Sequence, residues 1–389
     1  MEAVRLRTHR PGRIPARRGS LRSVMVLLVV VVLSAAVATT GPARVGARTA
    51  AADDYPDTLT CTPAECSGGI ALLLWAILWA LSHGYNQATP PPVAPVVVPG
   101  TVTPALPWRP FASTSAWNTP IAANTLTDAD SAAIVAALTT DPSKIAADLY
   151  EYGTPVYEAD ASTPRVKVTC TMNWGDCFLT HQLVPIPDNA AAASGSDGHL
   201  VVVDRTSGYS YELWQARKIN TTTWSASWGA VLPLDGDGRS TPVTNNAVGA
   251  GISRLAGLVR VNEIRNGDIP HALVFSSAKA CRGSYRYPAT TTDGNSSAAN
   301  CIPEGARIQL DPSIDVDSIA GITPGERTIA KALQTYGAYV GDTGGANMAF
   351  PFEVPTGEDG TNPYPAAGLA WDYHNMAHIP WNRIRVLGS

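Results

Sequence analysis

The chain has 389 residues, a formal net charge of −4 and an apolar fraction of 45%. Charged residues make up only 15%, well below the roughly 25% of an average soluble domain, which excludes a coiled coil or a charge-driven disordered chain. The 33 glycines and 31 prolines favour a turn-rich, mainly β architecture, and the scattered apolar segments exclude a polytopic membrane protein.

The net charge is the sum of two unlike parts. Residues 1–50 contain nine arginines and one glutamate, which leaves 19 basic and 31 acidic residues, a net charge of −12, in the rest of the chain. Such an acidic body disfavours nucleic acid or an anionic membrane surface as a partner.

The basic amino terminus precedes an apolar run at residues 24–38 and then small residues, which is typical of a secretory signal. Cleavage is expected near residues 47–52. The alternative is an uncleaved anchor, although the run is shorter than the roughly 20 residues of a membrane span. We expect a secreted protein, with membrane contact only through residues 1–50; the alternative location is an anchored protein on the extracellular face.

Two segments separate this leader from the main domain. Residues 51–88 contain two cysteines and an apolar stretch at 70–81, which is too short for a transmembrane helix. Packing of this stretch against protein is the default expectation, and the alternatives are a position in a membrane interface or a pro-segment. Residues 89–107 contain seven prolines and are expected to form an extended linker. A β-rich globular domain is predicted at 108–389.

The six cysteines form three local pairs along the chain. Six cysteines permit fifteen pairings, and an even number after an export signal indicates disulfides. Pairing of sequence neighbours is the simplest solution, and the alternative of a metal site lacks a Cys-x-x-Cys motif. The predicted disulfides are Cys61–Cys66, Cys170–Cys177 and Cys281–Cys301.

Two helices and a series of short strands are predicted in the globular domain. One helix covers residues 128–138, and another begins at Thr323, where Pro324 and Glu326 complete a helix-start motif. Thr206-Ser207-Gly208 indicates a hairpin, and residues 263–271 resemble a second one. The predicted strands are 165–171, 199–204, 210–214, 258–264, 271–275, 306–310 and 383–387. The expected fold is mainly β, a β-sandwich or jelly-roll-like domain with a few peripheral helices.

The first hairpin contains the strongest candidate for acid–base chemistry. His199 begins one strand, and Glu212 lies on the other, on the same face as Trp214. A carboxylate beside tryptophan in a partly buried sheet is expected to have a raised pKa, as a general acid needs. A solvent-facing glutamate at a strand position is the structural alternative.

Two further candidates stand at the ends of predicted strands. His271 begins an apolar strand across a turn from Glu263, where the alternative is a buried histidine with a purely structural role. Asp342 ends a short apolar strand before a glycine-rich loop, a setting in which sites are assembled, or else it only stabilises a turn. His374 and His378 have the i, i+4 spacing of a helical metal site, but Pro380 disfavours a long helix there.

Several blocks of the sequence resemble a family of secreted actinobacterial-type proteins of uncharacterised function. The matching blocks are HLVVVD at 199–204, YELW at 211–214, LAGLVR at 255–260, IPHAL at 269–273, and KALQTYG at 331–337 with Asp342. They span roughly residues 197–345. The resemblance implies a shared sandwich-like fold and a shared cleft.

The combined features predict a secreted enzyme that acts on an extracellular polysaccharide or cell-wall glycan by hydrolysis or β-elimination, without a cofactor. The predicted catalytic residues are Glu212, His199, His271 and Asp342, and the predicted substrate-binding residues are Trp214, Asp197 and Arg260. The main alternative is a non-catalytic carbohydrate- or wall-binding protein with aromatic stacking surfaces, and a third possibility is a metal site built from the histidines.

Overall fold

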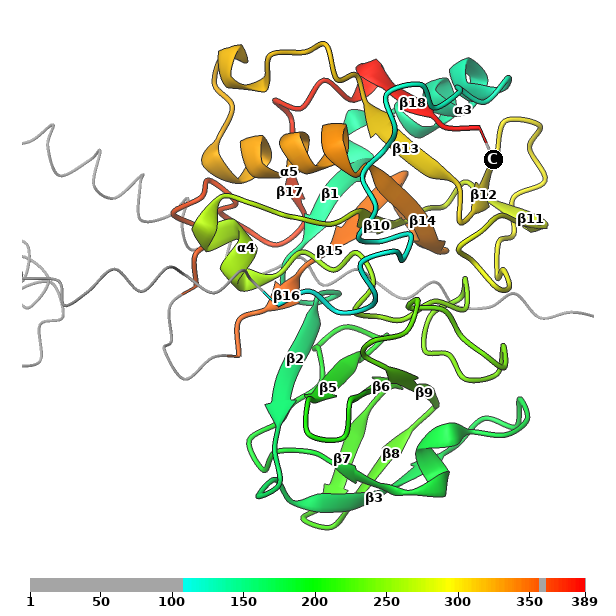
Figure 1. Cartoon of the computed structure of the whole chain (residues 1–389), viewed down its shortest axis with the longest axis vertical. Helices are drawn as coiled ribbons and strands as arrows, with labels where there is room; N and C mark the ends of the chain where they lie inside the picture. The colour runs from blue at the N-terminus through cyan, green and yellow to red at the C-terminus, as the bar shows by residue number, and fades with distance from the viewer. Residues whose placement is uncertain (1–107, 357–361, 389) are drawn as a thin grey trace, which may run out of the picture. The chain divides into compact units, whose positions relative to one another are not determined.

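Strands dominate the structure of this chain, as predicted from its composition (Figure 1). The structure is a computed structural model that describes residues 108–356 and 362–388. The predicted signal, the segment 51–88, the linker and the Cys61–Cys66 pair lie outside the described residues. Within them, the strands form four sheets, accompanied by three α-helices and short 3-10 turns.

The largest sheet has seven strands and mixed strand directions. Its strands, in spatial order, are β17 (His374–Asn375), β1 (Ile145–Asp148), β15 (Met348–Pro351), β10 (Leu273–Ser276), β14 (Ala338–Asp342), β13 (Arg307–Leu310) and β18 (Ile384–Val386). Strands β1 and β15 are parallel, as are β10 and β14, and β15 meets β10 in antiparallel orientation.

A second region is a β-sandwich made of two sheets. The five-stranded sheet contains β16 (Glu353–Val354), β2 (Thr154–Ala159), β5 (Leu200–Asp204), β6 (Tyr209–Trp214) and β9 (Trp228–Pro233). The four-stranded sheet contains β4 (Leu183–Pro185), β3 (Arg165–Cys170), β8 (Thr223–Ala226) and β7 (Arg217–Asn220). A small separate sheet pairs β11 (Ala280–Tyr285) with β12 (Ile302–Glu304). The predicted hairpin at residues 206–208 is confirmed, because β5 and β6 pair across it.

Strand alternation explains how the sandwich forms. Leu200 and Val202 of β5 belong to the core between the two sandwich sheets, whereas Val201 and Val203 belong to a different core cluster. That other cluster also contains Val274 of β10 and Tyr339 of β14. Apolar packing therefore joins the sandwich to the seven-stranded sheet and holds the two in one arrangement.

The same alternation gives the seven-stranded sheet two unlike faces. Large side chains such as Phe275 and Phe350 point into the main core, where helices α3 (Ser131–Leu138) and α5 (Pro324–Thr335) pack. The other face carries small or polar residues, among them Ala146, Ala349 and Ser276, and these line a cleft. Small side chains on one face therefore leave the space in which a ligand can lie.

Helix α5 begins where the sequence indicates. The Thr323 hydroxyl accepts a hydrogen bond from the Glu326 amide at 3.2 Å, and the Glu326 carboxylate accepts one from the Thr323 amide at 3.0 Å. Pro324 occupies the first turn, and Gly337, with φ of +68°, follows the end of the helix. The predicted helix start is thus confirmed.

The prediction of a strand at 258–264, and of a hairpin from 263 to 271, is wrong. Val261–Asn266 form helix α4, and Gly267 ends it with φ of +71°. The Glu263 carboxylate accepts a hydrogen bond from the Arg260 amide at 2.7 Å and so stabilises the helix start. The closely spaced apolar residues suggested a strand, but the hydrogen bond from the Arg260 amide to Glu263 stabilises a helix instead.

Two of the predicted disulfides are confirmed, Cys170–Cys177 and Cys281–Cys301. Because disulfides persist in oxidising compartments, they point to an extracellular environment. Within residues 108–356 and 362–388, none of the helices combines the length and the apolar character that a membrane span requires.

The 3-10 turns are η1 (Pro142–Lys144), η2 (Phe178–His181), η3 (Val316–Ser318) and η4 (Trp381–Arg383).

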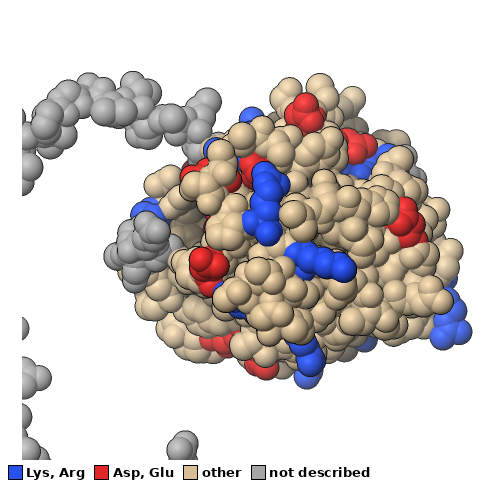
Figure 2. Space-filling view, turned by 90° about the horizontal axis from the view of Figure 1, so that it is seen from below, with Lys and Arg blue, Asp and Glu red and all other residues tan. Residues whose placement is uncertain are grey.

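Charged side chains are sparse on the molecular face in Figure 2, where lysines, arginines, aspartates and glutamates are scattered among uncharged residues. No single-signed patch dominates this face.

Candidate active-site cleft

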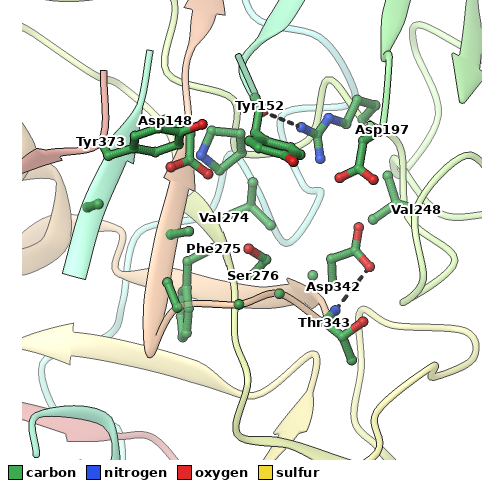
Figure 3. Close-up of a pocket in the computed structure, with 18 of the residues that line it drawn as sticks. Asp148, Tyr152, Asp197, Val248, Val274, Phe275, Ser276, Asp342, Thr343 and Tyr373 are labelled. Atoms are coloured by element: carbon green, nitrogen blue, oxygen red, sulfur yellow. Dashed lines mark hydrogen bonds between the residues drawn. The ribbon is translucent and has the colours of Figure 1, made fainter. Parts of the chain in front are cut away.

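A cleft of about 610 Å³ lies on the small-residue face of the seven-stranded sheet, with residues 196–197 and 248–256 on its other walls (Figure 3). Its volume is within the roughly 300–1,000 Å³ of small-molecule sites. Three carboxylates, one half-buried guanidinium and two tyrosine rings line it: Asp148, Asp197, Asp342, Arg254, Tyr152 and Tyr373.

Asp342 enters the cleft because β14 is irregular. Alternation along β14 would turn Asp342 toward the core, on the face of Val340. The register between β10 and β14 shifts by one residue after Phe275, so that Asp342 rather than Gly341 pairs with Ser276. Paired residues share a face, and the carboxylate therefore faces the cleft.

The surroundings of Asp342 favour its protonated form. Burial, followed by the negative charge of Asp293, raises the pKa of Asp342 to about 8, although Arg254 opposes the shift. Among the described residues, its carboxylate accepts one hydrogen bond, from the Thr343 amide at 3.0 Å. A carboxylic acid that holds its proton at neutral pH can act as a general acid.

Asp148 lies on the opposite side of the cleft, at the end of β1 and beside Tyr373 (Figure 3). Burial and the neighbouring Asp372 raise the pKa of Asp148 to about 7. Asp372 also accepts hydrogen bonds from the amides of three consecutive residues, 149–151, at 2.8–3.2 Å. This carboxylate fixes the segment between Asp148 and Tyr152.

Asp197 comes from the other side of the cleft, in the loop before β5. Its carboxylate points toward that of Asp342 in Figure 3. The adjoining Gly198 has φ of +43°, and a Cβ there would lie 3.3 Å from Gln215. The loop therefore passes closely over β6 with Asp197 directed into the cleft. Two carboxyl groups from different sheets thus face one another.

Arg254 is the half-buried cation of this cluster. Its Nε donates to the Thr154 hydroxyl at 2.8 Å and its Nη2 to the Tyr152 carbonyl at 3.2 Å. Burial lowers the pKa of Arg254, but the carboxylates of Asp342, Asp197, Asp148 and Glu212 oppose this shift. A single guanidinium therefore balances several carboxylates, and the surplus negative charge favours proton uptake by Asp148 and Asp342.

Glu212, predicted as the acid or base, lies beneath the cleft and does not line it. It is fully buried in β6 and accepts hydrogen bonds from the Ser210 hydroxyl at 2.9 Å, the Arg254 amide at 2.7 Å and the Ser253 hydroxyl. Burial raises its pKa, although these bonds act in the other direction. Glu212 thus holds residues 253–254 in place, as a positioning residue.

His199 is also buried next to the cleft without lining it. Burial, and then the Arg254 charge, lower the pKa of His199 well below its usual value, so the ring is neutral. Its Nδ1 has no hydrogen-bond partner among the described residues. The His199 ring is buried and does not reach the cleft surface.

His271 and Arg260 lie in a separate, paired network around helix α4. His271 Nε2 is 2.8 Å from Glu263 Oε1, and Arg260 Nε donates to Glu353 at 2.8 Å. Neither residue lines the cleft. The structure therefore brings together Asp197 and Asp342 from the predicted set, and separates them from Glu212, His199, His271 and Arg260.

Trp214 lines a side groove that adjoins the cleft, about 430 Å³ in volume. Sequence reasoning missed Asp148, Arg254 and the two cleft tyrosines. Asp148 ends a four-residue strand rich in alanine, which lacks a β-propensity signal. Arg254 lies in an irregular segment, and only the fold reveals its burial.

The described residues contain no group of three histidine, cysteine, aspartate or glutamate side chains arranged to hold a metal ion. His378 pairs instead with Glu326, at 2.8 Å between Nδ1 and Oε2, and His374 lies in β17. Comparisons of the chain with protein-family models, curated proteins and solved structures gave no match. The residues of the cleft are therefore the basis for inferring function.

Proposed function

We propose that this protein is a secreted glycoside hydrolase that cleaves an uncharged polysaccharide, with Asp342 as general acid and Asp197 as its partner carboxylate. The observation that carries the proposal is a carboxylic acid with a raised pKa facing a second carboxylate in one accessible cleft. Pairs of carboxyl groups with separate roles are the usual machinery of glycoside hydrolysis.

In this reaction the bond between the anomeric carbon and the glycosidic oxygen breaks. Asp342 gives its proton to the departing oxygen, and Asp197 accepts a proton from the water that attacks the anomeric carbon. Asp197 then releases its proton to solvent, and Asp342 takes up a new one, which restores the starting state. Arg254 stabilises the ionised form of the neighbouring carboxylates. The negative charge that these groups retain, including that of Asp148, favours an oxocarbenium-like transition state.

The charge balance supports hydrolysis over β-elimination. Elimination from a uronic acid requires a cation that neutralises the sugar carboxylate, so that its α-proton can leave. Arg254, the half-buried cation of the cleft, already interacts electrostatically with four carboxyl groups, and Lys144 is at the exposed rim. An acidic sugar would meet net repulsion in the cleft.

The test is an activity screen of the secreted protein on uncharged and acidic polysaccharides. We expect new reducing ends from an uncharged polymer, and a decrease of about 10²–10⁴-fold in the Asp342→Asn variant. Aryl glycosides with a good leaving group should be less sensitive to this change, because they do not need the acid. The matched control is Asp188→Asn, at an exposed position outside the cleft.

Three outcomes would contradict the proposal. Unsaturated products from an acidic polymer would indicate a lyase. Unchanged hydrolysis by Asp342→Asn would remove Asp342 from the mechanism. Binding of glycans without any turnover would favour the non-catalytic alternative.

A further inference from the structure

The cleft continues past the facing carboxylates into the side groove that contains Trp214. The two cavities share four lining residues, Asp197, Val248, Asp342 and Thr343. A ligand whose reacting bond lies between Asp197 and Asp342 would therefore extend directly into this groove. Three tryptophans form its outer wall, Trp174, Trp214 and Trp228.

The three indole rings form a layered platform. The rings of Trp174 and Trp214 are stacked, with centroids 5.8 Å apart and an angle of 21° between their planes. Trp228 supports Trp174 from a tilted position, also at 5.8 Å, and its Nε1 donates to the Thr244 carbonyl at 2.8 Å. Trp228 is 2% exposed, whereas Trp174 is 53% exposed. One ring anchors the platform and another presents its surface to solvent.

A disulfide holds the exposed ring in position. Trp174 lies in the loop between Cys170 and Cys177, which form a disulfide at the end of β3. Closing this short loop restricts the conformations available to Trp174 before any ligand binds. An exposed tryptophan on a restrained loop beside a cleft is an expected ligand contact rather than a scattered surface residue.

The polar groups of the groove indicate the class of ligand. They include the Asn246 amide and the hydroxyls of Thr291, Thr292 and Thr343, with the carboxylate of Asp293. Lysine and arginine do not occur among the lining residues. A nucleic acid, whose phosphates need cations, fits this surface poorly. Sugar rings fit it well, because they present apolar C–H faces to aromatic rings and hydroxyls to amides and alcohols.

We propose that this groove binds additional sugar residues of an uncharged glycan chain, with one ring stacked on Trp174. The inference rests on the proposed function for the position of the cleaved bond, and it adds that the substrate is a chain of several sugars. The enzyme would therefore prefer long oligosaccharides, because only these reach from the Asp197–Asp342 pair to Trp174.

Binding is tested with the full-length Asp342→Asn protein and a panel of probes: the hexasaccharides and disaccharides of cellulose, xylan, mannan, chitin and amylose, with hexagalacturonate as the acidic probe. Tryptophan fluorescence should change on addition of an uncharged hexasaccharide. Adding Trp174→Ala should lower the affinity for that hexasaccharide about tenfold and barely change the affinity for the disaccharide. Trp174→Phe should restore part of the loss.

The matched control is Trp371→Ala, since Trp371 is similarly exposed, at 58%, and lies outside the groove. Melting temperatures of all variants show whether a loss reflects misfolding. In the active protein, Trp174→Ala should raise KM for the polymer, whereas the control Trp371→Ala should leave this KM unchanged.

The outcomes separate the two proposals. If Trp174→Ala hydrolyses and binds long chains like its parent, the groove assignment is overturned while the hydrolase assignment stands. If hexasaccharides bind through Trp174 but nothing is hydrolysed, the hydrolase assignment is overturned while the groove assignment stands. Equal losses in Trp371→Ala, tighter binding of hexagalacturonate, or no binding of any hexasaccharide would each overturn the groove assignment.

Discussion

The cleft and the network around helix α4 contain similar side chains, but their charges are balanced differently. In the network each cation has a close anionic partner, Arg260 with Glu353 and His271 with Glu263. In the cleft, one guanidinium serves several carboxylates, and Asp342 accepts a single hydrogen bond. Paired charges stabilise a fold, whereas unbalanced carboxylates retain protons that chemistry can use.

The pKa shifts express this difference. His271 has an acceptor at each ring nitrogen, the Ala272 carbonyl at 2.9 Å and Glu263 at 2.8 Å. Burial alone would lower the pKa of His271, but Glu263 outweighs it and the pKa is raised, which favours the charged ion pair. Asp148 and Asp342 in the cleft shift toward the neutral form instead, with pKa values of about 7 and about 8.

The largest expected effect is on activity. Asp197→Ala should lower hydrolysis about 10²–10³-fold, and added azide should restore part of the bond cleavage, because azide attacks the anomeric carbon without a base and gives the glycosyl azide. His271→Gln, in the paired network, should change kcat less than about threefold. Initial rates on the same polysaccharide provide the measurement. A larger loss in His271→Gln than in Asp197→Ala would reverse the roles of the two regions.

The next effect is on stability beneath the cleft. Glu212→Ala leaves the Arg254 amide and two serine hydroxyls without their acceptor, and should lower the free energy of unfolding by about 3 kcal/mol. Urea denaturation provides the value, with Asp188→Ala as the control on the surface. A loss below about 1 kcal/mol would show that Glu212 is not a structural anchor.

The coupling free energy between Glu263 and His271 in the network should depend on pH. A double-mutant cycle of Glu263→Gln and His271→Asn should give a coupling of about 2 kcal/mol near pH 5.5. The raised pKa of His271 means that this stability is fully present below the unfolded-state pKa and is lost as pH rises through the folded-state pKa. Coupling that is constant from pH 5 to about 9 would contradict a charged pair.

The smallest effect is in the cleft, where substitution should stabilise the protein at high pH, whereas substitution of the ion pair in the network should destabilise it at low pH. Because the pKa of Asp342 is raised to about 8, the unfolding free energy falls as pH rises from about 4 to about 8. Asp342→Asn removes this loss, so its melting temperature should exceed that of the wild type by about 2–4 °C at pH 8 and match it near pH 4. Calorimetry across this range is the measurement, and a variant that is less stable at pH 8 would contradict a raised pKa.

Local signals were sufficient for several elements. The Thr206–Gly208 turn between alternating strands predicted the β5–β6 hairpin, and the Thr323, Pro324 and Glu326 motif predicted the start of α5. The spacing of cysteines predicted two disulfides. Each of these features depends on residues close in the chain. A few neighbouring positions are enough to specify a turn, a helix cap or a short disulfide loop.

The site was less predictable because it depends on distant pairings. Alternation placed Glu212 beside Trp214 along β6, but could not show that Ser253 and Arg254 cover the carboxylate from a loop forty residues later. Asp148 was missed because its short strand, β1, is stabilised by pairing with β15, about two hundred residues away, and no local pattern indicates this pairing.

Composition, charge asymmetry and local motifs by themselves determined that this chain has an acidic, mainly β body with disulfides, since these follow from residue content and short-range preferences. Only the tertiary structure decided which carboxylates meet. A one-residue register shift turns Asp342 into the cleft, and packing between two sheets brings Asp197 opposite it. Register and packing are long-range properties, because they depend on which surfaces are buried together.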